Sequence, residues 1–351
     1  RKIFRRRSAF RACFSCALDV GISYLEKKKI NCCNRNKYIE QFRNKGMIGQ
    51  DKVDRMVRLS KINALLLGCN ISNINSGNSI VGNSSINDYL GRVDLIFTNP
   101  PFGAEYGVEQ LNLCEYPILN SIGISAGSVD SELLMLDKSI ALLKENGYLA
   151  IVLPDSVFAS KGNNSLYRDA LLKQVYIKGV IELPSVTFAQ AGTRTNTCIL
   201  YLQKKQAVNE DKMFMALCED LGYIVKEKMG VPVKISKGKN EMLDIAKALI
   251  EKQTDKRIIL QKPSVTQITS LDLTENIIKP SFYAAERFVT VENITKGIRD
   301  GYTIKKLSEI AEFVTMSRKG FMVSESIKHI SVLHVNSNST INFNEVEQFV
   351  P

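Results

Sequence analysis

Short apolar segments typical of buried strands alternate with amphipathic segments through the middle of the chain. Residues 148–153, 177–183 and 197–203 are rich in apolar and β-branched side chains and are bounded by turn-forming or polar residues. Residues 166–175, between the first two, have apolar positions at helical spacing. Strand, helix and strand at this interval predict an α/β fold with a doubly wound sheet.

Further elements are predicted on both sides of this core. Residues 47–51 and 93–97 have the pattern of short strands, the second one β-branched and aromatic. Residues 31–41 are polar and predict a loop, and the Gly-, Ser- and Asn-rich stretch 103–129 is too long for an ordinary connection, which predicts a mobile functional loop. Helices are expected at 17–29, 53–67, 131–143 and 241–251. Gly68 is the expected C-terminal cap of the helix at 53–67.

The composition limits the class of protein. The 351 residues predict about two domains, with a boundary near residue 275 where the sequence changes character. Lys and Arg outnumber Asp and Glu by 47 to 36, and the formal charge of +11 favours a polyanionic partner. No apolar run reaches the length of about 18 residues that a membrane helix needs. Cysteines without disulfide-framework spacing favour a reducing, cytoplasmic location.

A metal centre is not expected. The chain has two histidines. The cluster Cys13, Cys16, Cys32 and Cys33 suggests zinc, but adjacent cysteines do not easily place both sulfurs on one tetrahedral ion, and a second C-x-x-C is missing.

The motif Asn99-Pro100-Pro101-Phe102 directly follows the strand at 93–97. The exocyclic amine of a nucleobase is a poor nucleophile because its lone pair is delocalised into the ring. The side-chain oxygen of Asn99 and the backbone oxygen of Pro100 can accept the two amine protons and free this lone pair. The prolines stiffen the turn, and Phe102 offers a face on which an extruded base stacks. A proline-rich turn with Phe102 simply buried is the structural alternative.

With its neighbours, this motif resembles the N6-adenine DNA methyltransferases, specifically the modification subunit of type I restriction-modification systems and related fused restriction-modification enzymes. The similarity runs from about residue 14 to residue 204. Residues 47–51, Met-Ile-Gly-Gln-Asp, are similar to the family's G-x-E segment. The other similar segments are the helix at 59–68, the catalytic segment at 94–103, the helix and strand at 131–154 and the later loop at 183–197.

The resemblance implies a Rossmann-like sheet that binds S-adenosylmethionine and transfers its methyl group to the N6 amine of a flipped-out adenine in double-stranded DNA. Asp51 is then expected to bind the ribose hydroxyls, and Asn78 replaces the aspartate that contacts the adenine of the cofactor. Phe188 and Arg194 fall in the base-proximal loop of the family. Specificity and restriction subunits, or fused equivalents, are the implied partners, and no membrane is implied.

The resemblance also divides the chain into segments. Residues 1–13 are interpreted as a degraded or truncated N-terminal segment, and 14–275 as the methyltransferase domain. Residues 276–351 resemble the truncated start of a target-recognition domain. The N-terminal arginines and the lysines of 226–239 are expected to contact phosphates, with a solvated charged surface as the alternative.

Two features depart from the family pattern. Where the family has the glycine-rich cofactor loop D-P-A-C-G-x-G-G-F, residues 6–14 contain no glycine. Glycine matters there because the backbone approaches the cofactor closely. Asn78 brings no charge where the family has Asp. Together these departures predict that the first strand is missing or degraded and that cofactor affinity is poor.

Two other functions remain open. A catalytically silent DNA-binding or assembly subunit, derived from such an enzyme, agrees with the missing glycines. Methylation of a protein glutamine or an RNA guanine also remains, because related enzymes share an N-P-P-aromatic loop.

Overall fold

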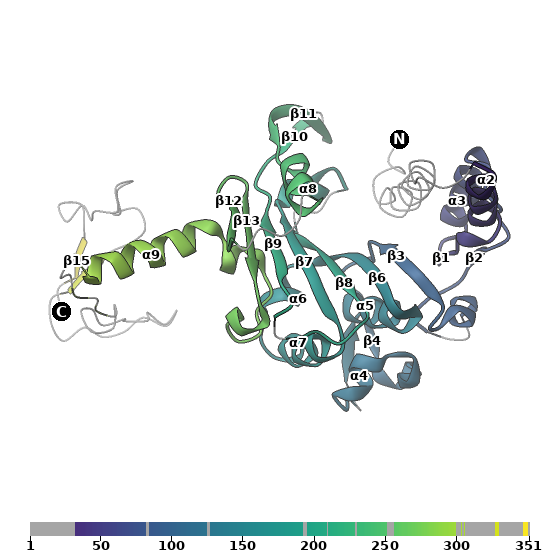
Figure 1. The fold of residues 1–351 in the computed structure, drawn as a ribbon, viewed down its shortest axis with the longest axis horizontal. Helices are drawn as coiled ribbons and strands as arrows, with labels where there is room; N and C mark the ends of the chain where they lie inside the picture. Colours follow the sequence, from purple (N-terminus) through teal and green to yellow (C-terminus); the bar gives the residue numbers. More distant parts are fainter. Residues whose placement is uncertain are drawn as a thin grey trace. The chain divides into compact units, whose positions relative to one another are not determined.

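The computed structural model describes residues 32–81, 84–124, 127–191, 195–208, 210–228, 230–250, 256–299, 303, 305, 327–329 and 347–349. The chain divides into two compact units, Arg1–Glu292 and Asn293–Pro351. The first contains a seven-stranded sheet with the order β12-β13-β9-β7-β8-β6-β3 (Figure 1). Its strands are β3 (Val93–Thr98), β6 (Leu143–Pro154), β7 (Tyr176–Leu183), β8 (Thr197–Gln203), β9 (Met213–Leu217), β12 (Ile258–Leu260) and β13 (Ser264–Ile268).

Strand direction identifies the class of this sheet. β3 is parallel to β6, and β7 is parallel to β9, whereas β8 is antiparallel to both of its neighbours, β6 and β7. β13 is antiparallel to β9 and β12. The predicted α/β sheet is therefore confirmed, with antiparallel strands inserted among parallel ones.

Helices cover the sheet because the strands alternate their apolar side chains between its two faces. On β9, Met213 and Met215 belong to the main core, whereas Phe214 and Ala216 belong to a second cluster that includes Ile245. The helices of this unit are α2 (Cys32–Gln41), α3 (Asp54–Leu66), α4 (Pro117–Ser121), α5 (Ser131–Leu142), α6 (Ser156–Ala159), α7 (Asn163–Gln174) and α8 (Met242–Ile250). None of the helices in the described part of the chain is long and apolar enough to span a membrane.

Shorter elements complete the first unit. The two-stranded pairs are β1 (Gly49–Asp51) with β2 (Ile74–Ser76), β4 (Glu105–Gly107) with β5 (Ser128–Asp130), and β10 (Leu221–Lys228) with β11 (Val231–Asn240). The short 3-10 and π helices in the described part of this unit are η2 (Phe42–Gly46), η3 (Ser85–Tyr89), η4 (Val108–Gln110), η5 (Leu113–Glu115), η6 (Ser185–Ala191), η7 (Ser270–Asp272) and η8 (Pro280–Tyr283).

The unit boundary lies within α9 (Ala285–Arg299). Ile278 and Tyr283 belong to the main core, so the first unit extends past residue 275. In the second unit, β14 (Ile327–His329) and β15 (Glu347–Phe349) form an antiparallel pair. The functional division at residue 275 stays a prediction.

Most of the expected helices and strands are present within a few residues of their predicted bounds. The helix expected at 53–67 is α3, and Gly68 follows it with φ +71. The helix expected at 131–143 is α5, and Asp130 occupies its N-terminal cap position. The helix expected at 17–29 lies outside the described residues.

Two predictions of irregular structure are wrong, and one element was not predicted. Residues 31–41 are mostly helix α2, and the lysine-rich stretch 226–239, for which the sequence predicted no element, lies in a β-hairpin. The stretch 103–129 contains β4, α4 and most of β5, and Ile118 and Leu119 are fully buried. Asp137 in α5 fixes this segment, because its carboxylate accepts hydrogen bonds from the N–H groups of Ile118 (2.9 Å) and Leu119 (2.8 Å). Burial raises the pKa of Asp137 to about 7.

The sheet ends abruptly at β3. Among the described residues, β3 pairs only with β6, and β1 pairs only with β2. Leu95 and Phe97 on β3 are 49% and 42% exposed. Among the described residues β3 is therefore an edge strand, and the expectation that a strand is missing stays a prediction.

Candidate functional site

The proline motif lies at the carboxyl end of β3, where open α/β sheets hold their ligands. Pro100 is buried and Pro101 is exposed. The side-chain oxygen of Asn99 is buried and has no hydrogen-bond partner among the described residues. Because a buried acceptor without a donor costs free energy, this oxygen is a candidate for binding an external N–H group.

An aromatic pair stands beside the motif. The rings of Phe102 and Phe188 are 6.4 Å apart between centroids and nearly perpendicular, at 89°. Phe188 belongs to η6, which follows β7. The structure thus brings together two residues that the sequence assigned to one base-binding site.

The start of α5 holds the far end of the motif. The backbone N–H of Gly103 donates to Glu132 Oε1 at 2.8 Å. The backbone N–H of Ser131 donates to the carbonyl of Ala104 at 2.7 Å, and its hydroxyl lies 3.2 Å from the carbonyl of Pro101. Residues 101–104 are therefore fixed to a helix at three points.

Asp51 and Asn78 lie at the carboxyl ends of the parallel strands β1 and β2. The Asp51 carbonyl accepts a hydrogen bond from Gly77 N–H at 3.0 Å, so the two strand ends are adjacent. The Asp51 carboxylate accepts from Val53 N–H at 2.7 Å, and Asn78 Oδ1 accepts from Ile80 N–H at 3.0 Å. Burial raises the pKa of Asp51, and the Val53 N–H partly offsets this rise.

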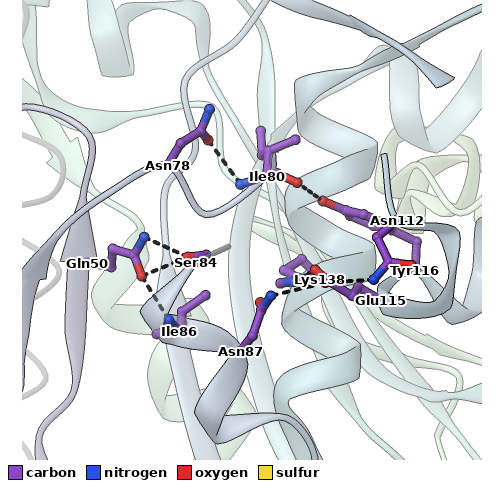
Figure 2. Close-up of polar contacts among 10 residues, drawn as sticks. All are labelled: Gln50, Asn78, Ile80, Ser84, Ile86, Asn87, Asn112, Glu115, Tyr116 and Lys138. Carbon is purple, nitrogen blue, oxygen red and sulfur yellow. Dashed lines mark hydrogen bonds and ion pairs between the residues drawn. The ribbon is translucent and has the colours of Figure 1, made fainter. Parts of the chain in front are cut away.

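Gln50, beside Asp51, is a polar centre that the sequence did not reveal. Its side chain bonds the Ser84 hydroxyl at 2.7 Å and the Ile86 N–H at 3.0 Å. A Cβ added at Gly77 would lie 2.6 Å from Gln50 Nε2, so a larger residue here would displace the Gln50 side chain. Gln50 therefore fixes the chain that leaves β2 against β1 (Figure 2).

The same connecting segment is bound to α5. Figure 2 shows Tyr116 donating its hydroxyl hydrogen to the Ile80 carbonyl, and Lys138 of α5 paired with Glu115. Glu115 Oε1 also accepts from Asn87 Nδ2 at 3.0 Å. Ile80 and Asn87 are thus each connected to the segment that packs on the helix that holds the proline motif.

The predicted site residues form two groups. Asn99, Pro100, Pro101 and Phe102 meet Phe188, and Asp51 meets the Gly77–Asn78 turn. Among the described residues, no hydrogen bond, ion pair or ring contact joins Asp51 or Asn78 to Asn99. Arg194 lies outside the described residues, as do Cys13 and Cys16. Gln50 and Glu132 were not predicted, because Gln50 binds Ser84, 34 positions away, and Glu132 binds Gly103, 29 positions away.

The fold is similar to that of a solved methyltransferase subunit. A similar solved structure is the type I restriction-modification system methyltransferase subunit from Streptococcus thermophilus, with a TM-score of 0.53, 18% identity, and coverage of 68% of this chain and 48% of that one. The chain belongs to the N-6 DNA methylase family, which it matches over residues 25–262.

Curated relatives are type I restriction enzyme methylase subunits. The StySPI subunit of Salmonella potsdam is 27% identical and the EcoKI subunit of Escherichia coli strain K12 is 26% identical, each over 171 residues. Each match covers 48% of this chain and 30% of the relative. The chain therefore spans about a third of these relatives.

Proposed function

We propose that this chain carries the catalytic segment of an enzyme that methylates the N6 amine of adenine in double-stranded DNA, within a restriction-modification system. The proposal includes specificity and restriction subunits, or fused equivalents, as partners and a cytoplasmic location. The observation that carries it is the buried, unpartnered oxygen of Asn99 at the end of β3.

The chemistry follows from this oxygen. An adenine amine placed at Asn99 donates one proton to the Asn99 oxygen and the other to the Pro100 carbonyl. The nitrogen then becomes more tetrahedral and its lone pair is freed. Because the amine becomes cationic in the transition state, the two oxygens stabilise developing charge and not only the bound base. Phe102 supports the extruded ring by stacking.

S-adenosylmethionine supplies the electrophilic methyl group when bound. The residues fit its ribose: the Asp51 carboxylate has one oxygen engaged by Val53 N–H, and no hydrogen-bond partner for the other occurs among the described residues. Asn78 Oδ1 accepts a backbone N–H, which leaves room for a second donor on this oxygen. Asp51 would hold the ribose hydroxyls and Asn78 the adenine amine of the cofactor.

Calorimetry with S-adenosylmethionine tests this fit. The enzyme proposal predicts binding of micromolar strength, loss of that binding in Asp51→Ala because the ribose acceptor is removed, and no loss in Asp88→Ala, an exposed aspartate of η3. Incorporation of labelled methyl groups into DNA, and not into RNA or protein, completes the test.

The catalytically silent subunit is the second candidate, and the glycine-free segment 6–14 favours it. A version in which residues 6–14 carry the family's glycine-rich sequence separates the two. If only this version binds S-adenosylmethionine, the chain acts through DNA or partner binding.

The β10–β11 hairpin supports DNA as the partner. Its register pairs Lys226 with Val233, and Lys237 lies farther along β11, where the register shifts. Both lysines are exposed and have no ion pair among the described residues, whereas Lys239 pairs with Asp244 at 2.7 Å. The hairpin packs against η6, which holds Phe188. The hairpin that carries these lysines therefore contacts the helical segment that holds Phe188.

Replacing Lys226 and Lys237 by Gln is expected to weaken binding to a DNA duplex most at low salt. The slope of log K against log salt should fall by about 1.8, because each lost phosphate contact contributes about 0.9. Fluorescence anisotropy across a salt series measures the slope. Lys173→Gln, on the exposed surface of α7, is the matched control and should leave the slope unchanged.

A further inference from the structure

Glu132 is a buried carboxylate beside the proline motif. It is 6% exposed and has no ion pair among the described residues. Its two oxygens accept from Gly103 N–H at 2.8 Å and from the Ser131 hydroxyl at 3.0 Å. Burying an unpaired carboxylate costs several kcal/mol, so hydrogen bonds and the N-terminus of α5 must stabilise it here.

The groups that stabilise Glu132 belong to the motif and its anchor. Gly103 has φ +78, a conformation that glycine adopts without strain, and its N–H points to Glu132. The Ser131 hydroxyl lies within reach of both Glu132 Oε2 and the Pro101 carbonyl, at 3.0 and 3.2 Å. The carboxylate and the turn therefore hold each other in place.

We infer that Glu132 is a positioning residue that, with Ser131, clasps residues 101–104 and so fixes the direction of the Asn99 and Pro100 oxygens. This inference rests on the proposed function, in which those oxygens bind the adenine amine. Two residues separate Pro100 from Gly103, and two prolines stiffen the turn. A fixed Gly103 therefore limits the orientation of Pro100, and misplacement of about 1 Å at such a site lowers rates about a hundredfold.

Replacing Glu132 by glutamine separates the effect of its hydrogen bonds from the effect of its charge. In Glu132→Gln the amide oxygen still accepts from Gly103, and the amide nitrogen donates to Ser131 Oγ, whose hydrogen turns to the Pro101 carbonyl. Glu132→Ala removes the acceptor. Glu286→Ala is the matched control, because Glu286 lies in the first turn of α9, is exposed, and has no side-chain hydrogen bond among the described residues.

Amide hydrogen exchange at Gly103 tests the clasp without any catalysis. Exchange should accelerate at least about tenfold in Glu132→Ala and stay within about threefold of the parent in Glu132→Gln and Glu286→Ala. In methyl transfer, Glu132→Ala should lower kcat about a hundredfold with KM for S-adenosylmethionine nearly unchanged, and Glu132→Gln should restore kcat.

Unchanged Gly103 exchange in Glu132→Ala overturns the inference, as does equal loss of kcat in the Ala and Gln variants. If Glu132→Ala does not fold, Ser131→Ala replaces it, because this change removes only the hydroxyl bonds; the inference then requires faster exchange at residues 102–104. If the unmodified protein does not transfer methyl groups, only the proposed function is refuted. The exchange experiment still tests whether Glu132 holds residues 101–104 in place.

Discussion

Asn99→Ala is expected to lower the rate of methyl transfer to DNA about 10²- to 10³-fold, the range measured when one preorganised polar group is removed from a transition-state site. The cause is the loss of the acceptor that stabilises the cationic amine. The free energy of unfolding should hardly change, because the Asn99 oxygen has no partner among the described residues that the change would leave unpaired. A filter-binding assay with labelled S-adenosylmethionine and thermal unfolding measure the two effects.

Asn36→Ala, an exposed asparagine of α2, controls for the change in residue type and should alter neither quantity. A large destabilisation by Asn99→Ala would mean that the oxygen supports the fold. Undiminished transfer by a stable Asn99→Ala protein would remove the observation on which the proposed function rests.

Arg168→Ala is expected to destabilise the protein by about 3–5 kcal/mol, the largest effect on stability that the described contacts predict. Arg168 is 1% exposed. Its guanidinium donates to the Asn276 carbonyl at 3.1 Å and the Val157 carbonyl at 3.0 Å. Alanine leaves both carbonyls without this donor and opens a cavity at α7. Urea unfolding should show a lower midpoint.

Arg92→Ala is the control, because Arg92 is exposed and its guanidinium has no hydrogen bond among the described residues. It should change the free energy of unfolding by less than about 0.5 kcal/mol. A similar small effect from Arg168→Ala would show that residues 276–278 dock on α7 without this arginine.

The strands and helices with strong periodicity were predictable, and the long-range polar contacts were not. The pattern at 93–98 predicts both β3 and the motif that follows it. Gln50 has no local signal, because its partners Ser84 and Ile86 lie 34 and 36 positions away. The role of Asp137 in folding residues 117–119 is equally invisible in the periodicity of α5.

The errors have physical causes. The hairpin was not predicted because lysines occupy positions on its exposed strands where apolar alternation is expected, and Gly238, with φ +85, interrupts the pattern. Helix α2 is polar, so it lacks the apolar spacing on which helix prediction depends. Each of the two groups of site residues was predicted from a motif. The hydrogen bonds that hold these groups in place were not predictable from the sequence.

Among the described residues β3 is an edge of the sheet, and two of its apolar side chains are about half exposed. The unpaired backbone N–H and C=O groups of an edge strand are a template on which a second strand adds. The formal charge of +11 keeps identical copies apart, and added salt weakens this repulsion. A polyanion that neutralises the lysines acts in the same direction.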